Sequence, residues 1–332
     1  QLIAENLVIW NSFGEMAAKL DLFVKAKALG YAPETRAILL APEGEVTNQF
    51  LLDCWHPYVE IVTDPAEIAR LQKAYEDHWL LLDYYRMPDG TCLQRFVAYP
   101  LVQRRWEEEG RAPLLSLDAD VIERGRAVLA KLGVPRDAWF ACLHVRDPVF
   151  FDEEVASNPN RYRNADIGTF APAIEAIVER GGWVVRLGTE DFTPMEPMDN
   201  VVDYAMTADR SDWMDVVCLS QCRFLLAGES GPVYVANAFG VPLVGVNWFP
   251  PGMWPLSRQD IFVPKRLHLA AEGRDLSINE AIQAPFFGMP FPNLYDSRGI
   301  EVIDSTPDDI KDAVVEMLDR LDGGMVYSSE DE

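Results

Sequence analysis

The chain has 332 residues, 49% of them hydrophobic and 25% charged, and a formal net charge of −24. This composition is typical of a globular protein with room for two domains, and so large an excess of acid argues against a nucleic-acid surface. No apolar run reaches the roughly 20 residues of a transmembrane helix, and no signal peptide is recognisable.

Five cysteines lack Cys-x-x-Cys spacing, and the four histidines form no ligand-like pair. Such cysteines are typical of reduced thiols in the cytoplasm rather than of a disulfide framework or a zinc site. We therefore expect a cytoplasmic protein without a bound metal ion or other cofactor.

The first part of the chain alternates apolar runs with helix-like periodic runs, as parallel α/β layers do. The pattern predicts strands at 7–10, 36–41, 59–62 and 79–82, and helices at 16–29, 46–55, 65–75 and 94–109. A break at 110–113, with Gly110 and Pro113 at its ends, predicts a linker. We place a first domain at 1–112.

A second alternating series follows, after a helix predicted at 116–132. Strands are predicted at 139–145, 183–187, 201–203, 223–227 and 242–246, and helices at 169–180, 211–221, 232–239 and 306–321. The acidic end, 323–332, is expected to be solvated. The expected fold class is α/β, with Rossmann-like domains at 1–112 and 113–306 facing a cleft.

A sharp strand-to-helix corner follows the predicted strand at 223–227. It contains Glu229, Ser230, Gly231 and Pro232. Glycine lets the backbone approach a ligand closely, and proline suits the first helical position because it has no N–H. Free N–H groups at a helix start attract phosphate, so the corner predicts an anion site. An ordinary tight turn is the alternative.

His144 and Arg146 lie at the carboxyl end of the strand predicted at 139–145. Arginine suits bidentate contact with a diphosphate and keeps its charge. His144 could donate to a phosphate oxygen or pin the loop. A purely structural pairing of Arg146 with Asp147 is the alternative.

The turn after the first predicted strand contains Asn11, Ser12, Gly14 and Glu15, and we expect it to face the cleft and bind the acceptor. A carboxylate at position 15 can accept a proton as general base. Alternatively, Glu15 is an acid in a first helical turn, stabilised by the helix dipole.

Weaker candidates lie at other predicted loops and helix starts. A charged loop and another strand end could reach a phosphate or sugar, although such loops are commonly solvated surface; these residues are Arg163, Asn164, Arg186 and Gly188. Asp212, with Asp215 one helical turn later, could contact a sugar hydroxyl or cap its helix.

These stretches together resemble glycosyltransferases of the GT-B class. The run "AGESGPVYVANAFGVPLVGV" is similar to the Asp/Glu-Ser-Gly-Pro signature of bacterial heptosyltransferase-like enzymes. "IWNSFGEMAAKLDLF" resembles the Gly-Asp turn after their first strand, whose acid serves as base, with Glu15 here in place of Asp. "CLHVRD" and "SDWMDVVCLS" are similar to motifs of the fucosyltransferase superfamily, in which the Arg binds the donor diphosphate.

Residues 139–265 also resemble a group of bacterial glycosyltransferases often joined to tetratricopeptide repeats. That group usually reads Gly-His where this chain has Gly14-Glu15. The resemblance implies an inverting, metal-independent transfer of a hexosyl or deoxyhexosyl group in bacterial glycan or glycoconjugate synthesis. Its implied partners are a nucleotide-sugar donor, a glycan, lipid-linked or protein acceptor, and a fused or partner domain. It also implies that helix 307–322 crosses back to the first domain.

The residues predict a role for each part of the cleft. Arg146 and the amides at Ser230 and Gly231 would stabilise the departing diphosphate, and Glu15 would take the acceptor proton. A nucleotide-sugar epimerase of the same fold and a catalytically inactive nucleotide-sugar-binding module are the alternatives, because fold alone does not fix function.

Overall fold

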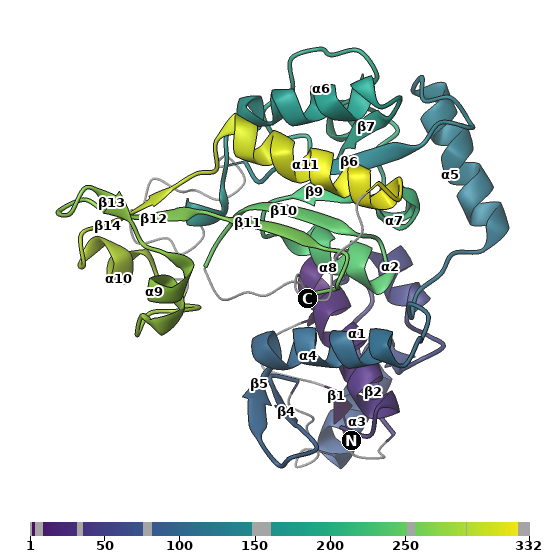
Figure 1. Cartoon of the computed structure of the whole chain (residues 1–332). Coiled ribbons are helices and arrows are strands. Elements are labelled where there is room, and N and C mark those ends of the chain that lie inside the picture. The colour runs from purple at the N-terminus through teal and green to yellow at the C-terminus, as the bar shows by residue number, and fades with distance from the viewer. Residues whose placement is uncertain are drawn as a thin grey trace.

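The computed structural model describes residues 2–3, 9–31, 36–75, 82–147, 161–250, 256–289 and 291–324. Two α/β units, each a parallel sheet with its helices, are stacked one above the other, and a smaller lobe lies at one side (Figure 1). We call the two units the first and the second layer. Residues 7–8 and 79–81 of the predicted strands, and 325–332 of the acidic end, lie outside the described residues.

The first layer contains a parallel sheet in the order β1-β2-β3. Its strands are β1 (Leu2–Ile3), β2 (Ile38–Leu40) and β3 (Glu60–Val62), and its helices are α1 (Phe13–Ala28), α2 (Gln49–Cys54), α3 (Pro65–Ala74) and α4 (Arg95–Glu108). The sequence did not predict β1 or the antiparallel pair β4 (Tyr84–Arg86) and β5 (Cys92–Gln94). Ile9–Asn11 forms a 3-10 turn rather than the end of the strand predicted at 7–10.

The second layer is a six-stranded parallel sheet in the order β11-β10-β9-β6-β7-β8. Its strands are β6 (Phe140–His144), β7 (Trp183–Arg186), β8 (Val201–Val202), β9 (Leu225–Ala227), β10 (Leu243–Trp248) and β11 (Ile261–Pro264). Its helices are α5 (Ala119–Lys131), α6 (Ala171–Glu179), α7 (Asp212–Gln221), α8 (Gly231–Ala238) and α11 (Pro307–Leu321). Because all neighbouring strands are parallel, their carboxyl ends form one edge of the sheet.

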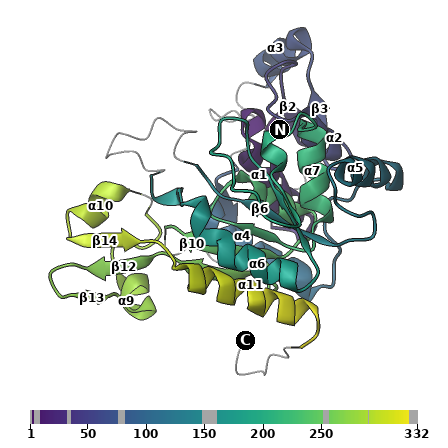
Figure 2. The ribbon, with the colours of Figure 1, turned by 90° about the horizontal axis from the view of Figure 1, so that it is seen from above.

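The last helix corrects one expectation. α11 lies beside α6 in both views (Figures 1 and 2), and its buried residues, among them Ile310, Val314 and Met317, join a core cluster with α6 and the second sheet. Burial of this apolar face fixes the helix on the second layer. It therefore covers the second sheet and does not cross back to the first domain.

The side lobe was not anticipated from the sequence. It contains the antiparallel sheet β13-β12-β14 and two short helices around a small core; these are β12 (Arg266–Leu269), β13 (Arg274–Asp275), β14 (Ile300–Ile303), α9 (Ile278–Gln283) and α10 (Pro292–Asp296). The lobe projects to the left of both layers in Figure 1.

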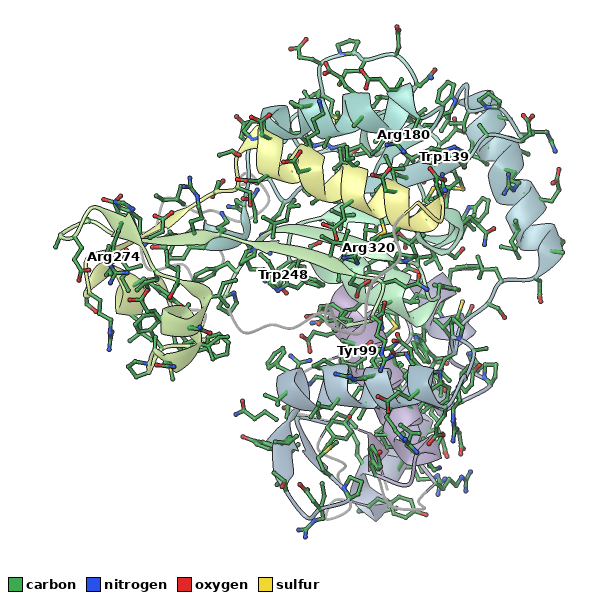
Figure 3. All side chains as sticks on the ribbon, in the orientation of Figure 1. Tyr99, Trp139, Arg180, Trp248, Arg274 and Arg320 are labelled. Carbon is green, nitrogen blue, oxygen red and sulfur yellow. The ribbon has the colours of Figure 1, made fainter. Side chains whose placement is uncertain are left out.

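The two layers share a packed interface in which α1 lies against α8. A buried polar network crosses it at Tyr99 of α4, labelled in Figure 3, whose hydroxyl donates to Asp21 Oδ2 at 2.7 Å and accepts from Asn237 Nδ2 at 3.1 Å. A second bond between the layers lies at the cavity, where Asn48 caps α2 and its Nδ2 donates to the Asp212 carbonyl at 2.9 Å. These bonds fix the two layers relative to one another around the cleft.

Candidate functional site

A cavity of about 570 Å³ lies between the two layers, at the carboxyl edge of the second sheet. The first layer contributes Asn11, Ser12 and Gly14 at the start of α1. A volume of this size is typical of small-molecule sites, and this edge is where open α/β sheets bind ligands.

Most of the residues singled out in the sequence line this cavity. From the second layer these are His144, Arg146, Arg163, Gly188, Asp212, Ser230 and Gly231. Four others, Glu15, Asn164, Arg186 and Glu229, are not among its lining residues. Each of these four instead pairs with a neighbouring group, as the following contacts show.

Two helix N-termini meet at the cavity. Ser12 is the N-cap of α1, and its side chain accepts from Glu15 N at 3.4 Å; Ser230 is the N-cap of α8. A Cβ atom on Gly14 would lie 2.5 Å from Gly231 Cα, closer than any real contact. Only a glycine at position 14 allows the two helices to start so close together. Their N–H groups and partial positive charges therefore converge on the same space, an arrangement suited to an anion.

Arg146 is buried, and its Nε donates to Asn164 Oδ1 at 3.0 Å. Asn164 is itself held by Lys265, whose Nζ donates to the Asn164 carbonyl at 3.1 Å and pairs with Asp304 at 2.5 Å. Asn164 therefore positions the guanidinium that lines the cavity. Asp147 beside it accepts from Thr193 N at 2.8 Å.

Arg163 is positioned in a similar way by Glu229. The two side chains form an ion pair, and Arg163 Nε also donates to the Glu229 carbonyl at 3.1 Å. Burial raises the pKa of Glu229, while the charges of Arg163 and Arg146 oppose that shift. These two contacts with Glu229 thus fix the position of the Arg163 guanidinium at the cavity.

His144 lies within the electrostatic influence of the neighbouring arginines. Burial, together with the charges of Arg186 and Arg146, lowers the pKa of His144 to about 4, so its ring is neutral at pH 7. Its Nδ1 is buried and has no hydrogen-bond partner among the described residues. A neutral imidazole offers one donor and one acceptor, which suits a polar ligand that carries its own charge.

Arg186 has a structural role in this arrangement. It is 1% exposed, and its Nη1 donates to Asp203 Oδ1 at 2.9 Å while its Nη2 donates to the Thr193 carbonyl at 2.9 Å. Asp203 Oδ2 also accepts from Met195 N at 2.9 Å. Arg186 therefore anchors the loop after β7, which forms one wall of the cavity.

Glu15 is held by Arg95 from α4. Arg95 Nη1 and Nη2 donate to the two Glu15 carboxylate oxygens at 2.5 and 2.8 Å, and the Glu15 side chain is 40% exposed. Charge-assisted bidentate pairs of this kind hold both oxygens in a fixed orientation. Each oxygen keeps a second lone pair, so Glu15 can accept a further hydrogen bond while it stays paired with Arg95.

Several lining residues were missed in the sequence, including Thr47, Thr189, Phe192 and Arg210. Asn48 was missed as well, because its contact with α7 joins residues 164 positions apart and leaves no local pattern. Among the described residues, no group of three or more His, Cys, Asp or Glu side chains is arranged to hold a metal ion. No helix in that part of the chain has the length and apolar character to cross a bilayer.

Comparison with known proteins defines the fold. The chain is similar to a solved glycosyl transferase family 9 structure from Veillonella parvula, with a TM-score of 0.52, 13% identity, and coverage of 96% of this chain and 95% of that one. It is also similar to E. coli ADP-heptose LPS heptosyltransferase II, with a TM-score of 0.50, 13% identity, and coverage of 97% and 98%. No protein-family model and no curated protein sequence matches it. The chain therefore has the GT-B fold, with two Rossmann-like domains facing a central cleft.

Proposed function

We propose that this protein is a glycosyltransferase that moves a sugar from a nucleoside diphosphate sugar to an acceptor hydroxyl. The observation that carries the proposal is the convergence of Arg146, Arg163 and the N-termini of α1 and α8 on one cavity of the GT-B cleft. A solved protein of the same fold is named for ADP-heptose, a donor of this kind. The acceptor would be a hydroxyl of a glycan, a lipid-linked sugar or a protein.

In the proposed reaction the acceptor oxygen attacks the anomeric carbon as the bond from that carbon to the diphosphate breaks. The diphosphate leaves with the electron pair, and negative charge grows on its oxygens. Arg146, Arg163 and the helix N–H groups would stabilise that charge in the partly enclosed cavity. They supply the charge compensation that a metal ion provides in other transferases, so we propose a metal-independent transfer.

A single displacement of this kind inverts the configuration at the anomeric carbon. The acceptor proton must leave, and we propose Glu15 as its destination. Glu15 does not line the cavity itself but follows Gly14, which does, and its side chain is 40% exposed. Its carboxylate would keep its bonds to Arg95 and accept from the acceptor hydroxyl through a remaining lone pair. Conversion of Glu15→Gln keeps the size of the side chain and removes the base.

The test is release of nucleotide from a panel of UDP-, GDP-, ADP-, CDP- and CMP-sugars, with and without acceptor glycans. Arg146→Ala should slow release by about 100-fold or more. Arg180→Ala should leave it unchanged; Arg180, labelled in Figure 3, pairs with Asp319 of α11 and does not line the cavity. Equal rates in both variants would overturn the proposed role of Arg146.

Two other outcomes would replace the proposal. Interconversion of free nucleotide sugars without release of nucleotide would indicate an epimerase. Binding of nucleotides with no turnover across the panel would indicate an inactive binding module. Each outcome uses the same protein and the same donors, so one series of assays separates the three functions.

A further inference from the structure

The cavity carries different charges along its length. One end, between β6 and α8, has Arg146, Arg163 and the N–H groups of the α8 start. The other, acidic end, near α7 and the loop after β7, has Asp212 and Asp215, whose charges Arg210 offsets in part. A diphosphate is attracted more strongly to the first end than to the acidic end.

The distance between the ends suits an extended ligand. In the sheet, β6 lies directly between β9 and β7, with His144 pairing with Ala227 and Leu143 with Arg186. Two steps between neighbouring strands span about 10 Å. A ligand whose diphosphate lies beside Gly231 can therefore reach the loop after β7 with the group attached to that diphosphate.

The acidic end has polar atoms without partners. Asp215 Oδ1 and Thr189 Oγ1 are both buried and make no hydrogen bond among the described residues. The other Asp215 oxygen, Oδ2, lies 3.4 Å from Arg210 Nη2, and Arg210 Nε donates to the Gly188 carbonyl at 2.7 Å. Arg210 thus holds Asp215 in place while one of its oxygens stays available to a ligand. Leaving a buried acceptor unsatisfied costs free energy, which a ligand N–H or O–H group can recover.

The same end has an apolar wall that a planar group could contact. Leu187, Phe192 and Leu219 line the cavity there, and the Phe192 ring lies 5.9 Å from the His144 ring. An aromatic base can bury its faces against such side chains while its edge or its ribose meets the carboxylate. A sugar, with hydroxyl groups on most of its carbons, gains less from an apolar wall.

We propose that Asp215 and Thr189 recognise the nucleoside of the donor, and that the donor lies along the cavity with its diphosphate at α8 and its nucleoside at α7. This inference rests on the proposed function. Asp215 accepts a hydrogen bond from an N–H of the base or from a ribose hydroxyl. It thereby becomes a residue that determines which nucleotide the protein binds.

The test measures affinities of GDP, ADP, UDP, 2′-deoxy-ADP and inorganic pyrophosphate by calorimetry. At pH 8, where its carboxyl is mostly ionised, Asp215→Asn should weaken nucleotide binding by about tenfold, because a charge-assisted hydrogen bond to the nucleoside becomes a neutral one. The same variant should not weaken pyrophosphate binding, because pyrophosphate has no nucleoside to contact position 215. Thr189→Val should also weaken the binding of nucleotides and not that of pyrophosphate. Asp199→Asn, at an exposed position that does not line the cavity, makes the same change of charge and should alter nothing.

The panel also distinguishes the two sources of the hydrogen bond. If Asp215 contacts the base, the wild type should discriminate among GDP, ADP and UDP, and Asp215→Asn should reduce the differences. If it contacts the ribose, 2′-deoxy-ADP should bind the wild type more weakly than ADP does, and the variant should bind both alike.

Failure of this inference differs from failure of the proposed function. Unchanged nucleotide affinities in Asp215→Asn, or an equal loss for pyrophosphate and nucleotides, would overturn the orientation while leaving the diphosphate site in place. Absence of binding of any nucleotide or of pyrophosphate by the wild type would overturn the proposed function itself.

Discussion

Substitution of Gly14 by alanine tests the arrangement on which the anion site depends. In an ordinary helix this change is favourable by up to about 1 kcal/mol, since alanine is the better helix former. Here the new Cβ would lie 2.5 Å from Gly231 Cα and 3.3 Å from the Gly231 carbonyl oxygen. These are backbone atoms, so no side chain can rotate away, and α1 and α8 have to separate.

Overpacking of this kind costs about 1–3 kcal/mol, which exceeds the helix-propensity gain. We expect Gly14→Ala to lower the free energy of unfolding in urea by about 1–2 kcal/mol, net of that gain. We also expect weaker binding of pyrophosphate, because the two helix N-termini would no longer face the same point. The measurements are urea titration followed by circular dichroism, and calorimetry with pyrophosphate.

Two other glycines provide graded controls. A Cβ on Gly231 would lie 3.1 Å from Gly14 N, whereas one on Gly228 would meet nothing closer than 3.6 Å. Gly228 is also absent from the residues with positive φ, so alanine fits its backbone. The expected order of destabilisation is Gly14, then Gly231, then Gly228. A Gly14→Ala protein as stable as the wild type would show that the helices do not meet as described.

Two further predictions concern buried charges. Burial raises the pKa of Asp215 to about 7 from an ordinary value of 3.8; the charge of Arg210 opposes this shift and that of Asp212 adds to it. The free energy of unfolding therefore falls as the pH rises from about 4 to about 7, because the folded protein holds this proton more tightly than the unfolded chain does. The shift of about 3 pH units corresponds to about 4 kcal/mol. The free energy of unfolding of Asp215→Asn, relative to that of the wild type, should therefore be larger at pH 8 than at pH 4. A difference between the two proteins that does not change with pH in urea titrations would contradict this. Arg186→Met should cost about 3–5 kcal/mol because it leaves the Asp203 carboxylate without its ion pair, and the double variant with Asp203→Asn should recover part of that loss in the same assay.

The second layer was largely predictable from the sequence because its signals are local. The strand predicted at 183–187 is Trp183–Arg186, and the helix predicted at 232–239 is Gly231–Ala238. Short apolar runs bounded by Gly and Pro carry both signals. The side lobe has no such alternation. The 3-10 turn at Ile9–Asn11 begins with two apolar residues, as a buried strand would.

The candidate site was predictable in position but less so in the roles of single residues. Parallel strands bring their carboxyl ends to one edge of the sheet, which predicts that His144 and Arg146 lie near the Ser230 corner. The direction of a long side chain depends on partners far away in the sequence. Arg186 turns to Asp203, and Asn164 turns to Arg146, so both support the cavity rather than line it.

The net charge of −24 and a site for a diphosphate are compatible because electrostatic interactions in salt are local. At physiological ionic strength the screening length is about 8 Å, so acids on the outer surface contribute little inside the cleft. There the nearby groups decide: Arg146, Arg163 and Arg210 line the cavity, and two helix N-termini open into it. The acids that do reach the cavity, Asp212 and Asp215, lie with Arg210 at the end where we place the uncharged nucleoside. The charge that matters for the ligand is therefore that of the groups lining the cavity, not the total over the chain.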